Sequence, residues 1–497
     1  DEYWAFLPPE AYDNIGTLRE NTAEIRFPAS GANAGVGVSK PYGFDGQLAL
    51  YQEQVDDDSL PDRWLFGGMR RGGRVVYALD VTTIGSPQLK WKVGCDDDDN
   101  CTTGGDFDDI GQTWSPISVT YSNGYDIETG TAKSPILLMG GGYDECEDDD
   151  NDGGDPDGGV APVNNSCTDS SRGRGVYVLD ANDGSLLKYL PTDRPVPGGV
   201  IVVYNDSRAN PPDLSIKYAY TADTGGNVYR IHAETPSVDG LSMLPAMIGT
   251  APPDEWVITK IAALGCDSLN TDASDLTCDA NRKFLFNPDV VEDPEVPNRN
   301  VVLVGSGDRE KPLTSYGTTF GLDNYFYSIV DYPLQADWFA SETSTCNTHA
   351  LVCMDSLATI DIDGGVSDLE EEELSDKGWK YPLRDGEQVV SGALTLSNLV
   401  NFSTHIPAEY VEGACDANLG TATTYNINYR TADGEPNDFP PGGLLPTPVA
   451  GLVDVDNDGD PELVCSGCGE GPVEFEEEEY TLDVEAPINR VYWNIEQ

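Results

Sequence analysis

Short apolar runs, each ended by glycine, asparagine or aspartate, recur along the whole chain. In each case a run of aliphatic residues leads into a glycine-rich turn, and a second run with an aromatic-x-aliphatic core follows. Short or alternating apolar runs with such boundaries are typical of β-hairpins. The five pairs of runs are residues 64–68 with 75–80, 136–142 with 175–180, the two halves of 218–231, 301–307 with 325–331, and 392–400 with 424–428.

The recurrence of hairpins, with few helical stripes, predicts an all-β fold in which blades of antiparallel sheet are arranged radially. We therefore predict one β-propeller domain of about seven blades over residues 1–497. Irregular spacing of the repeats indicates long insertions between blade strands, and these insertions carry the acidic runs and most cysteines. The aromatic positions expected to pack one blade on the next are Tyr77, Tyr177, Tyr229, Tyr327 and Tyr425.

Charge is the outstanding feature of the composition, since 87 acidic residues against 28 basic ones give a formal net charge of −59. Such a surface repels nucleic-acid phosphates and anionic lipid head groups, so neither is an expected partner. It attracts divalent cations, which hard oxygen ligands bind. Adaptation to a salty environment is an alternative, compatible explanation, because salt screens a large net charge. No apolar run reaches the ~18 residues of a membrane helix, so no membrane insertion is expected.

Most of the eleven cysteines fall in short-range sets. Four local pairs in acidic, turn-rich segments predict disulfides that staple long loops in an oxidising compartment, with reduced thiols as the alternative. Cys465 and Cys468 have the spacing of half a zinc site, but no second such pair completes it, so a structural disulfide is expected. The odd count leaves one of Cys415, Cys465 and Cys468 free or bridged elsewhere. The four local pairs are Cys95/Cys101, Cys146/Cys167, Cys266/Cys278 and Cys346/Cys353.

The strongest local motif is the acidic run at residues 454–462 (Asp-Val-Asp-Asn-Asp-Gly-Asp-Pro-Glu). Acids at positions 1, 3 and 5 can converge on one ion, the glycine at position 6 allows a sharp turn, and position 7 can offer its carbonyl oxygen. The acid at position 9 comes sooner than the last ligand of an EF-hand, and the apolar flanks suit strands rather than helices. An acidic turn without an ion is the alternative. The predicted calcium ligands are Asp454, Asp456, Asp458, Asp460 and Glu462.

A second acidic run, at residues 148–157, repeats the spacing of acids at positions 1, 3 and 5 with glycine at position 6. Any acid-rich run matches such a pattern easily by chance, so this run is the second candidate and not the first. The shorter run at 361–364 is interpreted as a turn. The predicted ligands of the second candidate are Asp148, Asp150, Asp152 and Asp155.

Enzymatic motifs are missing from the sequence. Its three histidines, His232, His349 and His405, are scattered and lack metal-ligand spacing. No phosphate-binding loop, nucleophile elbow or HExxH motif is present. We therefore expect a non-enzymatic protein without catalytic residues, with calcium as its cofactor.

Several motifs resemble, in order, those of PilY1-type proteins of the type IV pilus tip. Residues 4–9 (WAFLPP) are similar to the family's "WAFIPP" segment, which precedes its propeller. Three internal motifs and a C-terminal one extend this similarity over nearly the whole chain. They are residues 71–81 against "GGRGVFALDV", 305–312 with 325–327 against "GTGDREHP…FYAVKD", 378–379 with 386–390 against "KGWYLDL…GERV", and 490–493 against the closing strand.

The resemblance implies a propeller that forms the C-terminal part of a larger secreted protein, exported through the periplasm of a Gram-negative-type bacterium. It implies a place at the pilus tip, where the family supports pilus extension and surface attachment while calcium controls retraction. The implied partners are minor pilins of the tip complex and a host, surface or matrix ligand.

One departure from the family pattern changes where calcium is expected. The family's calcium loop precedes the strand that matches residues 221–231, but residues 205–213 lack alternating acids here. We therefore expect calcium in the later loop, at 454–462. Two other functions stay open: a carbohydrate- or matrix-binding surface propeller unrelated to pili, and a quinoprotein dehydrogenase. Against the dehydrogenase, no two cysteines are adjacent and the eight tryptophans follow no blade period.

Overall fold

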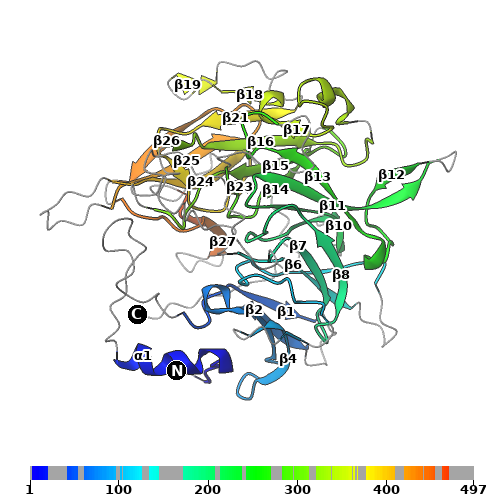
Figure 1. Cartoon of the computed structure of the whole chain (residues 1–497), viewed down its shortest axis with the longest axis vertical. Coiled ribbons are helices and arrows are strands. Elements are labelled where there is room, and N and C mark those ends of the chain that lie inside the picture. The colour runs from blue at the N-terminus through cyan, green and yellow to red at the C-terminus, as the bar shows by residue number, and fades with distance from the viewer. Residues whose placement is uncertain are drawn as a thin grey trace, which may run out of the picture.

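The computed structural model of the chain is built mostly from antiparallel β-sheet, with one α-helix, α1 (Tyr12–Glu20), in its described part (Figure 1). The remaining helical segments are 3-10 turns: η1 (Pro9–Ala11), η2 (Arg70–Gly72), η3 (Pro253–Glu255), η4 (Ala340–Ser344) and η5 (Met354–Ser356). The described residues are 3–20, 42–53, 61–96, 101–102, 105–125, 134–144, 172–206, 213–237, 242–269, 282–294, 296–312, 321–336, 338–360, 362–363, 366–367, 377–408, 419–439, 442–453 and 462–468.

Five antiparallel sheets, here called sheets 1 to 5, follow one another along the chain, and a parallel pairing of Ser215 with Tyr121 joins sheets 2 and 3. Sheet 1 consists of β1 (Leu48–Gln52), β2 (Arg63–Gly68), β3 (Arg74–Asp80) and β4 (Gln88–Cys95). Sheet 2 consists of β5 (Ser118–Tyr121), β6 (Pro135–Gly140), β7 (Gly175–Asp180) and β8 (Leu186–Pro191). Sheet 3 consists of β9 (Ile201–Asp206), β10 (Asp213–Ala222), β11 (Asn227–Pro236) and β13 (Val257–Ala263), and β12 (Met243–Ala246) extends β11 as a side hairpin.

Sheets 4 and 5 repeat this order with short additions. Sheet 4 consists of β14 (Asp289–Glu292), β15 (Asn300–Gly305), β16 (Tyr325–Asp331) and β21 (Gly378–Pro382), with β18 (Ala358–Thr359) beside β21. In sheet 5, β22 (Gln388–Val389) and β23 (Leu394–Leu396) both pair with β24 (Leu399–Ile406), which leads to β25 (Thr421–Asn428) and β26 (Gly434–Phe439). The short strands are β17 (Val352–Cys353), the pair β19 (Ile362–Asp363) and β20 (Val366–Ser367), and the pair β27 (Val449–Val453) and β28 (Glu462–Ser466).

The predicted hairpins become the central strands of these sheets. Four of the five pairs of runs correspond to β2–β3, β6–β7, β10–β11 and β15–β16, each paired antiparallel as expected. The fifth pair is confirmed only in part, because the run at 392–400 contains β23, a turn and only the first two residues of β24, which pair with Asn428 and Ile427 of β25. Ser397 in that turn has a φ of 55°, and β25 pairs instead with residues 399–406.

The five repeated tyrosines are all buried, which confirms that they are core positions. Each lies in the third strand of its sheet, where side chains contact both neighbouring strands. On one side of Tyr177, for example, Phe107 stacks against its ring at 5.5 Å, while Tyr189 lies 5.0 Å away in the next strand. Aromatic side chains from a loop and from the adjacent strand therefore pack around this core position.

Neighbouring sheets pack face to face in sequence order. One apolar cluster joins sheets 1 and 2, a second joins sheets 2 and 3, a third joins sheets 3 and 4, and a fourth joins sheets 4 and 5. The first strands of successive sheets also touch one another, since β1 contacts β5, β5 contacts β9, β9 contacts β14 and β14 contacts β23. Figure 1 shows the same progression, from the blue sheet 1 to the orange strands of sheet 5.

A buried ion pair connects sheets 3 and 4. The Arg230 guanidinium on β11 donates to both carboxylate oxygens of Asp331 on β16, at 2.6 and 2.8 Å. The Tyr220 hydroxyl donates to the same carboxylate at 2.8 Å and accepts from the Asn300 amide. Burial alone disfavours each charge, so the two groups stabilise the interface only as a pair with these hydrogen bonds.

We expect Asp331→Ala to lower the free energy of unfolding by about 3–5 kcal/mol, because it leaves the Arg230 charge buried and unpaired. Urea unfolding of the full chain measures this change. Glu292→Ala is the control, since Glu292 pairs with Lys217 at the surface and its loss is expected to cost under ~1 kcal/mol. Equal losses in the two variants would contradict a structural role of the buried pair.

Candidate functional site

The predicted calcium loop connects two paired strands. β27 and β28 run antiparallel with Val453 opposite Glu462 and Val449 opposite Ser466. This confirms the expectation that the apolar flanks form strands and not the helices of an EF-hand. The loop begins and ends at directly paired residues, whose Cα atoms lie about 5 Å apart in antiparallel strands. The two ends of the loop are therefore held close together.

The proposed ligands themselves lie beyond the part of the chain that the structure describes. Residues 454–461 are outside the described ranges, and of Glu462 only the backbone, as the first residue of β28, is described. The second candidate run, with Asp148, Asp150, Asp152 and Asp155, also lies outside them. Calcium binding at either run stays a prediction. Near the third run, β19 pairs antiparallel with β20 through Asp363 and Val366, while Asp361 and Gly364 lie outside the described residues.

The cysteine pair beside the loop is a disulfide. Cys465, opposite Ala450 in the hairpin, is bonded to Cys468, so the spacing that could have been half a zinc site is used for a structural bond. Because the bond forms within two residues of the end of β28, it fixes the strand that carries Glu462. Among described residues, no group of three or more His, Cys, Asp or Glu side chains is arranged to hold a metal ion.

Two further predicted disulfides, Cys95–Cys101 and Cys346–Cys353, are present. Cys266 is also disulfide-bonded, to a partner outside the described residues, where Cys146, Cys167, Cys278 and Cys415 lie too. These bonds indicate that the chain folds in an oxidising compartment.

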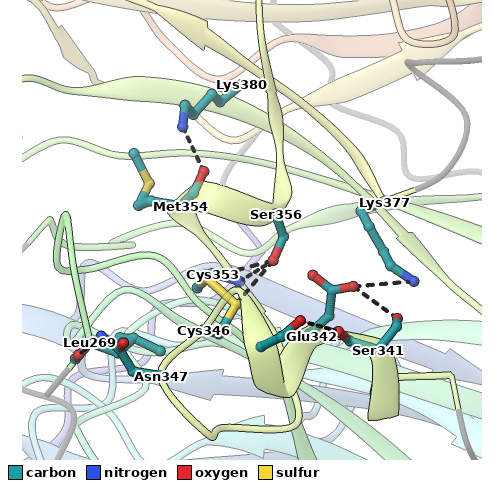
Figure 2. Close-up of a disulfide and its surroundings, with 11 residues drawn as sticks. Leu269, Ser341, Glu342, Cys346, Asn347, Cys353, Met354, Ser356, Lys377 and Lys380 are labelled. Carbon is teal, nitrogen blue, oxygen red and sulfur yellow. Dashed lines mark hydrogen bonds and ion pairs between the residues drawn. A yellow bond between two sulfur atoms is a disulfide. The ribbon is translucent and has the colours of Figure 1, made fainter. Parts of the chain in front are cut away.

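The Cys346–Cys353 disulfide closes an insertion that bridges two sheets (Figure 2). At the bond itself, β17, which contains Cys353, pairs with β13 of sheet 3, and a few residues further on β18 pairs with β21 of sheet 4. Ser356 accepts a hydrogen bond from the Cys353 amide at 3.1 Å, and the Lys380 ammonium donates to the Met354 carbonyl at 2.6 Å. The disulfide therefore staples a segment that holds sheets 3 and 4 together at their outer strands.

A buried ion pair supports the other side of the same insertion. Glu342 on η4 forms an ion pair with Lys377, with 3.6 Å between the carboxylate oxygen and the ammonium nitrogen. The same ammonium lies 3.3 Å from the centre of the Trp338 ring. Both charged side chains are buried, and Figure 2 shows them pointing toward one another beside the disulfide, to its right in this view. The Asn347 amide also donates to the Leu269 carbonyl, which ties this insertion to the loop that carries Cys266.

We expect replacement of both cysteines by alanine, Cys346→Ala with Cys353→Ala, to lower the free energy of unfolding by about 2–4 kcal/mol. The loss follows because the unfolded chain regains the freedom that the closed loop removes. Chemical unfolding checks it, with the exposed Ser344→Ala on η4 as the matched control. If the double variant unfolds at the same denaturant concentration as the control, the insertion is not held by its disulfide.

Asp223 is a functional-looking carboxylate that sequence reasoning missed. It lies at the turn between β10 and β11. Its Oδ1 accepts from the Gly225 and Asn227 amides at 2.9 and 3.0 Å, and its Oδ2 accepts from the Tyr229 hydroxyl at 2.8 Å. Burial raises the pKa of Asp223. Because these donors occupy both carboxylate oxygens, Asp223 stabilises the turn between β10 and β11. The Asp-x-Gly-Gly-Asn spacing in the sequence was the signal that could have predicted this role.

His232 is a core residue and not a catalytic one. Its Nδ1 lies 2.7 Å from the Ala233 carbonyl and must donate there, which leaves Nε2 to accept from the Thr259 hydroxyl at 2.8 Å. This arrangement fits a neutral ring. Burial, followed by the nearby Arg230 charge, lowers the pKa of His232 to about 4.

This shift predicts a pH-dependent loss of stability. In the unfolded chain the ring titrates near its ordinary pKa of about 6.5, so below that pH the unfolded state binds the extra proton. We expect the stability advantage of the wild type over His232→Gln to fall by about 2–3 kcal/mol between pH 7 and pH 4.5. Urea unfolding of both proteins at several pH values measures it. Parallel pH profiles would contradict a neutral buried ring.

Comparisons with known proteins support a fold but no sequence family. No protein-family model matches the chain, and no curated protein matches it. Among solved structures, the chain is similar to the C-terminal domain of Pseudomonas aeruginosa PilY1, with a TM-score of 0.55 and 14% identity over 94% of this chain and 87% of that one.

Two other matches are too distant to carry an argument. The computationally designed Ika8 protein has a TM-score of 0.24 and 10% identity over 86% of this chain and 95% of its own. A europium-containing methanol dehydrogenase has a TM-score of 0.20 and 9% identity over 82% and 83% of the two chains.

The chain is thus a mostly β, disulfide-bonded protein of several packed antiparallel sheets. More narrowly, it has the fold of the PilY1 C-terminal domain, which confirms the resemblance drawn from its motifs. Within the described residues, no helix is both long enough and apolar enough to cross a membrane.

Proposed function

We propose that this chain is a secreted β-propeller that serves as a calcium-binding, non-enzymatic adhesion and assembly module at the tip of a type IV pilus. One observation carries this proposal: the fold match to the PilY1 C-terminal domain extends over 94% of the chain. The ordered motifs of the sequence support the same assignment independently. Minor pilins of the tip complex and a host, surface or matrix ligand are the proposed partners, with neither nucleic acid nor a membrane among them.

In this proposal each sheet is one blade of a single propeller domain of residues 1–497. The first strands of sheets 1 to 5 contact their neighbours in order, as the inner strands of blades do around a common axis. The described residues contain these five sheets and the β19–β20 and β27–β28 hairpins. A total of about seven blades remains the prediction of the sequence.

Calcium would act on the loop between β27 and β28. Binding by Asp454, Asp456, Asp458, Asp460 and Glu462 would neutralise several like charges in a short loop and hold it in one conformation. The paired strands and the Cys465–Cys468 disulfide supply a fixed base for that loop. Calcium would therefore order a surface segment without rearranging the sheets.

The contact surface would be presented by the disulfide-stapled insertions. The insertion closed by Cys346–Cys353 is held at its base by sheet pairing on both sides, so its outer residues keep a fixed shape. A fixed surface reduces the ordering entropy lost on binding. The acidic surface elsewhere would keep the chain from associating with other anionic molecules.

Calcium titration by calorimetry tests the metal assignment. In 0.15 M NaCl, which screens diffuse attraction to the acidic surface, we expect saturable binding to the wild type and at least tenfold weaker binding to Asp456→Ala. Asp355→Ala, which removes an exposed acid outside the loop, is the control and should titrate like the wild type. Identical heats for wild type and Asp456→Ala would remove the loop from the proposal.

The pilus assignment is tested in the bacterium that makes the protein. Antibody labelling should place it at fibre ends, and deletion of its gene should reduce surface piliation and attachment. Labelling spread evenly over the cell surface, with normal pili in the deletion strain, would favour a surface propeller unconnected with pili.

A further inference from the structure

Three arginines from two distant sheets lie at the same end of the sheet stack. Arg70 and Arg71 belong to η2, in the turn from β2 to β3 of sheet 1, and Arg309 lies in the connection from β15 to β16 of sheet 4. Because antiparallel strands reverse at every turn, these connections lie at the end of each sheet where the linker to the next sheet begins. The three residues are called the arginine site.

Contacts between the linkers bring this end of the sheets together. The Arg70 amide donates to the Thr113 hydroxyl, in the linker that leads into sheet 2, at 3.2 Å. A Cβ on Gly199, in the linker into sheet 3, would lie 3.5 Å from Pro116 of the first linker and 3.5 Å from Asn287 of the linker into sheet 4. Three successive linkers therefore meet beside the arginine site.

Arg309 reaches the same place from sheet 4. Its guanidinium lies 5.9 Å from the centre of the Phe286 ring, in the linker into sheet 4, and donates to the Val390 carbonyl next to β22 at 2.8 Å. Burial lowers the pKa of Arg309, the neighbouring Glu310 charge raises it, and the charges of the other two arginines lower it again. The guanidinium groups of the site are therefore close enough to repel one another.

Two of these guanidinium groups have most of their hydrogen-bond donors open. Within the described part of the chain, Arg309 gives one hydrogen bond, to Val390, and forms no ion pair. The side chain of Arg70 donates no hydrogen bond there, and it lies 3.9 Å from the Asp45 carboxylate and 5.3 Å from the centre of the Trp114 ring. A guanidinium has five N–H donors, so both groups can bind a further acceptor.

The backbone indicates that the side chain of Arg70 is needed where it is. Arg70 has a φ of 56°, in the left-handed region that strains any residue with a side chain. Glycine adopts this conformation without strain, and the chain has glycines at 72 and 73 but not at 70. Strained positions of this kind concentrate at binding sites, where the surrounding structure holds them in place.

The charges of the site favour a monovalent anion. Arg71 is held by Asp45, whose carboxylate accepts from its Nε at 2.7 Å. Burial raises the pKa of Glu310, while the charges of the nearby arginines oppose this shift. In formal charges, the three arginines against Asp45 and Glu310 leave one positive charge, on a chain whose net charge is −59. One carboxylate neutralises that charge, whereas the surrounding negative field opposes a dianion.

The open donors also favour a carboxylate over a ligand that stacks. A carboxylate accepts two parallel hydrogen bonds from one guanidinium. The aromatic rings of the site are already engaged, because Trp114 stacks on Tyr143 at 4.2 Å and lies beside Arg70, while Phe286 lies beside Arg309. A sugar ring, which needs an open aromatic face, is therefore a poorer match than an acidic side chain.

We propose that Arg70 and Arg309 together bind the carboxylate of one aspartate or glutamate side chain of a protein partner. Arg71, fixed by Asp45, positions η2 and adds to the local positive charge. The acidic surface around the site limits the partner to a single inserted carboxylate and repels a strongly acidic protein. The site needs neither calcium nor a pilus, so its failure leaves the proposed function standing.

Arginine labelling of the full chain tests the site. Phenylglyoxal modifies open guanidinium groups, and mass spectrometry of peptides locates each one. The probe is N-acetylglutamate α-amide, with N-acetylglutamine α-amide at the same ionic strength as its uncharged control. We expect the glutamate probe to slow labelling of Arg70 and Arg309 several-fold and to leave Arg63, at the surface end of β2, unchanged. Equal labelling rates at Arg70 and Arg309 with the two probes would overturn the proposal.

Thermal unfolding of two variants gives a second measurement. The glutamate probe should raise the melting temperature of the wild type and of Arg63→Gln above that found with the glutamine probe. Arg70→Gln and Arg309→Gln should both lose this difference. Since Arg309→Gln also removes the hydrogen bond to Val390, Arg70→Gln keeps the test decisive if the other variant does not fold.

Two outcomes of this measurement count against the proposal. A difference that persists in Arg70→Gln shows that the probe binds elsewhere. A larger rise with sodium glucuronate or inorganic phosphate than with the glutamate probe, lost in Arg70→Gln, overturns the assignment to a side-chain carboxylate. It would identify the ligand as a sugar acid or a phosphate instead.

Discussion

Burial of the central strands on both faces is the constraint on which the rest of this structure depends. Every residue of β6, β7 and β15 is buried, which is possible only if a sheet packs on each side of the one that contains them. Their sequences are accordingly continuous aliphatic runs and not alternating ones. The outer strands have only one covered face, and their sequences mix polar and apolar residues. Stacking of successive sheets therefore follows from the composition of these strands, and the insertions are free to differ because they lie outside the stack.

Glycines at the ends of β2 and β6, the second strands of sheets 1 and 2, allow the sheets to stack closely. The segment that leads to the next sheet passes directly over these ends: a Cβ on Gly68 would lie 2.6 Å from the Thr113 carbonyl oxygen, and one on Gly140 would meet the Val196 carbonyl. From the sequence these glycines were interpreted as turn residues. The structure assigns them a second role, since only a residue without a side chain lets the linker approach the strand so closely.

The few basic residues and the many acidic ones have different places in the molecule. Few basic residues are available, and several of them are buried against single acids, as Arg230 is against Asp331 and Lys377 against Glu342. These pairs connect elements that are far apart in sequence. Because the chain has 87 acids and 28 bases, most of the acids cannot pair with a base, and the acidic runs lie in the sequence insertions that carry most of the cysteines. Disulfides then hold those loops to the sheets without requiring a larger apolar core.

The sequence by itself determined four of the five central hairpins, the tyrosine core positions, the Cys95–Cys101 and Cys346–Cys353 disulfides and the strands that flank the candidate calcium loop. Each of these depends on residues close together in the chain, whose spacing and chemistry are visible directly. The bounds of the fifth repeat were predicted incorrectly, because the turn at Ser397 has a positive φ. Serine does not indicate such a turn in a sequence as glycine would. Only the tertiary structure decided the partnership of Arg230 and Asp331, 101 residues apart, and the closed hydrogen-bond shell of Asp223. Those features depend on the register of strands and on which sheets meet, and long-range packing sets both.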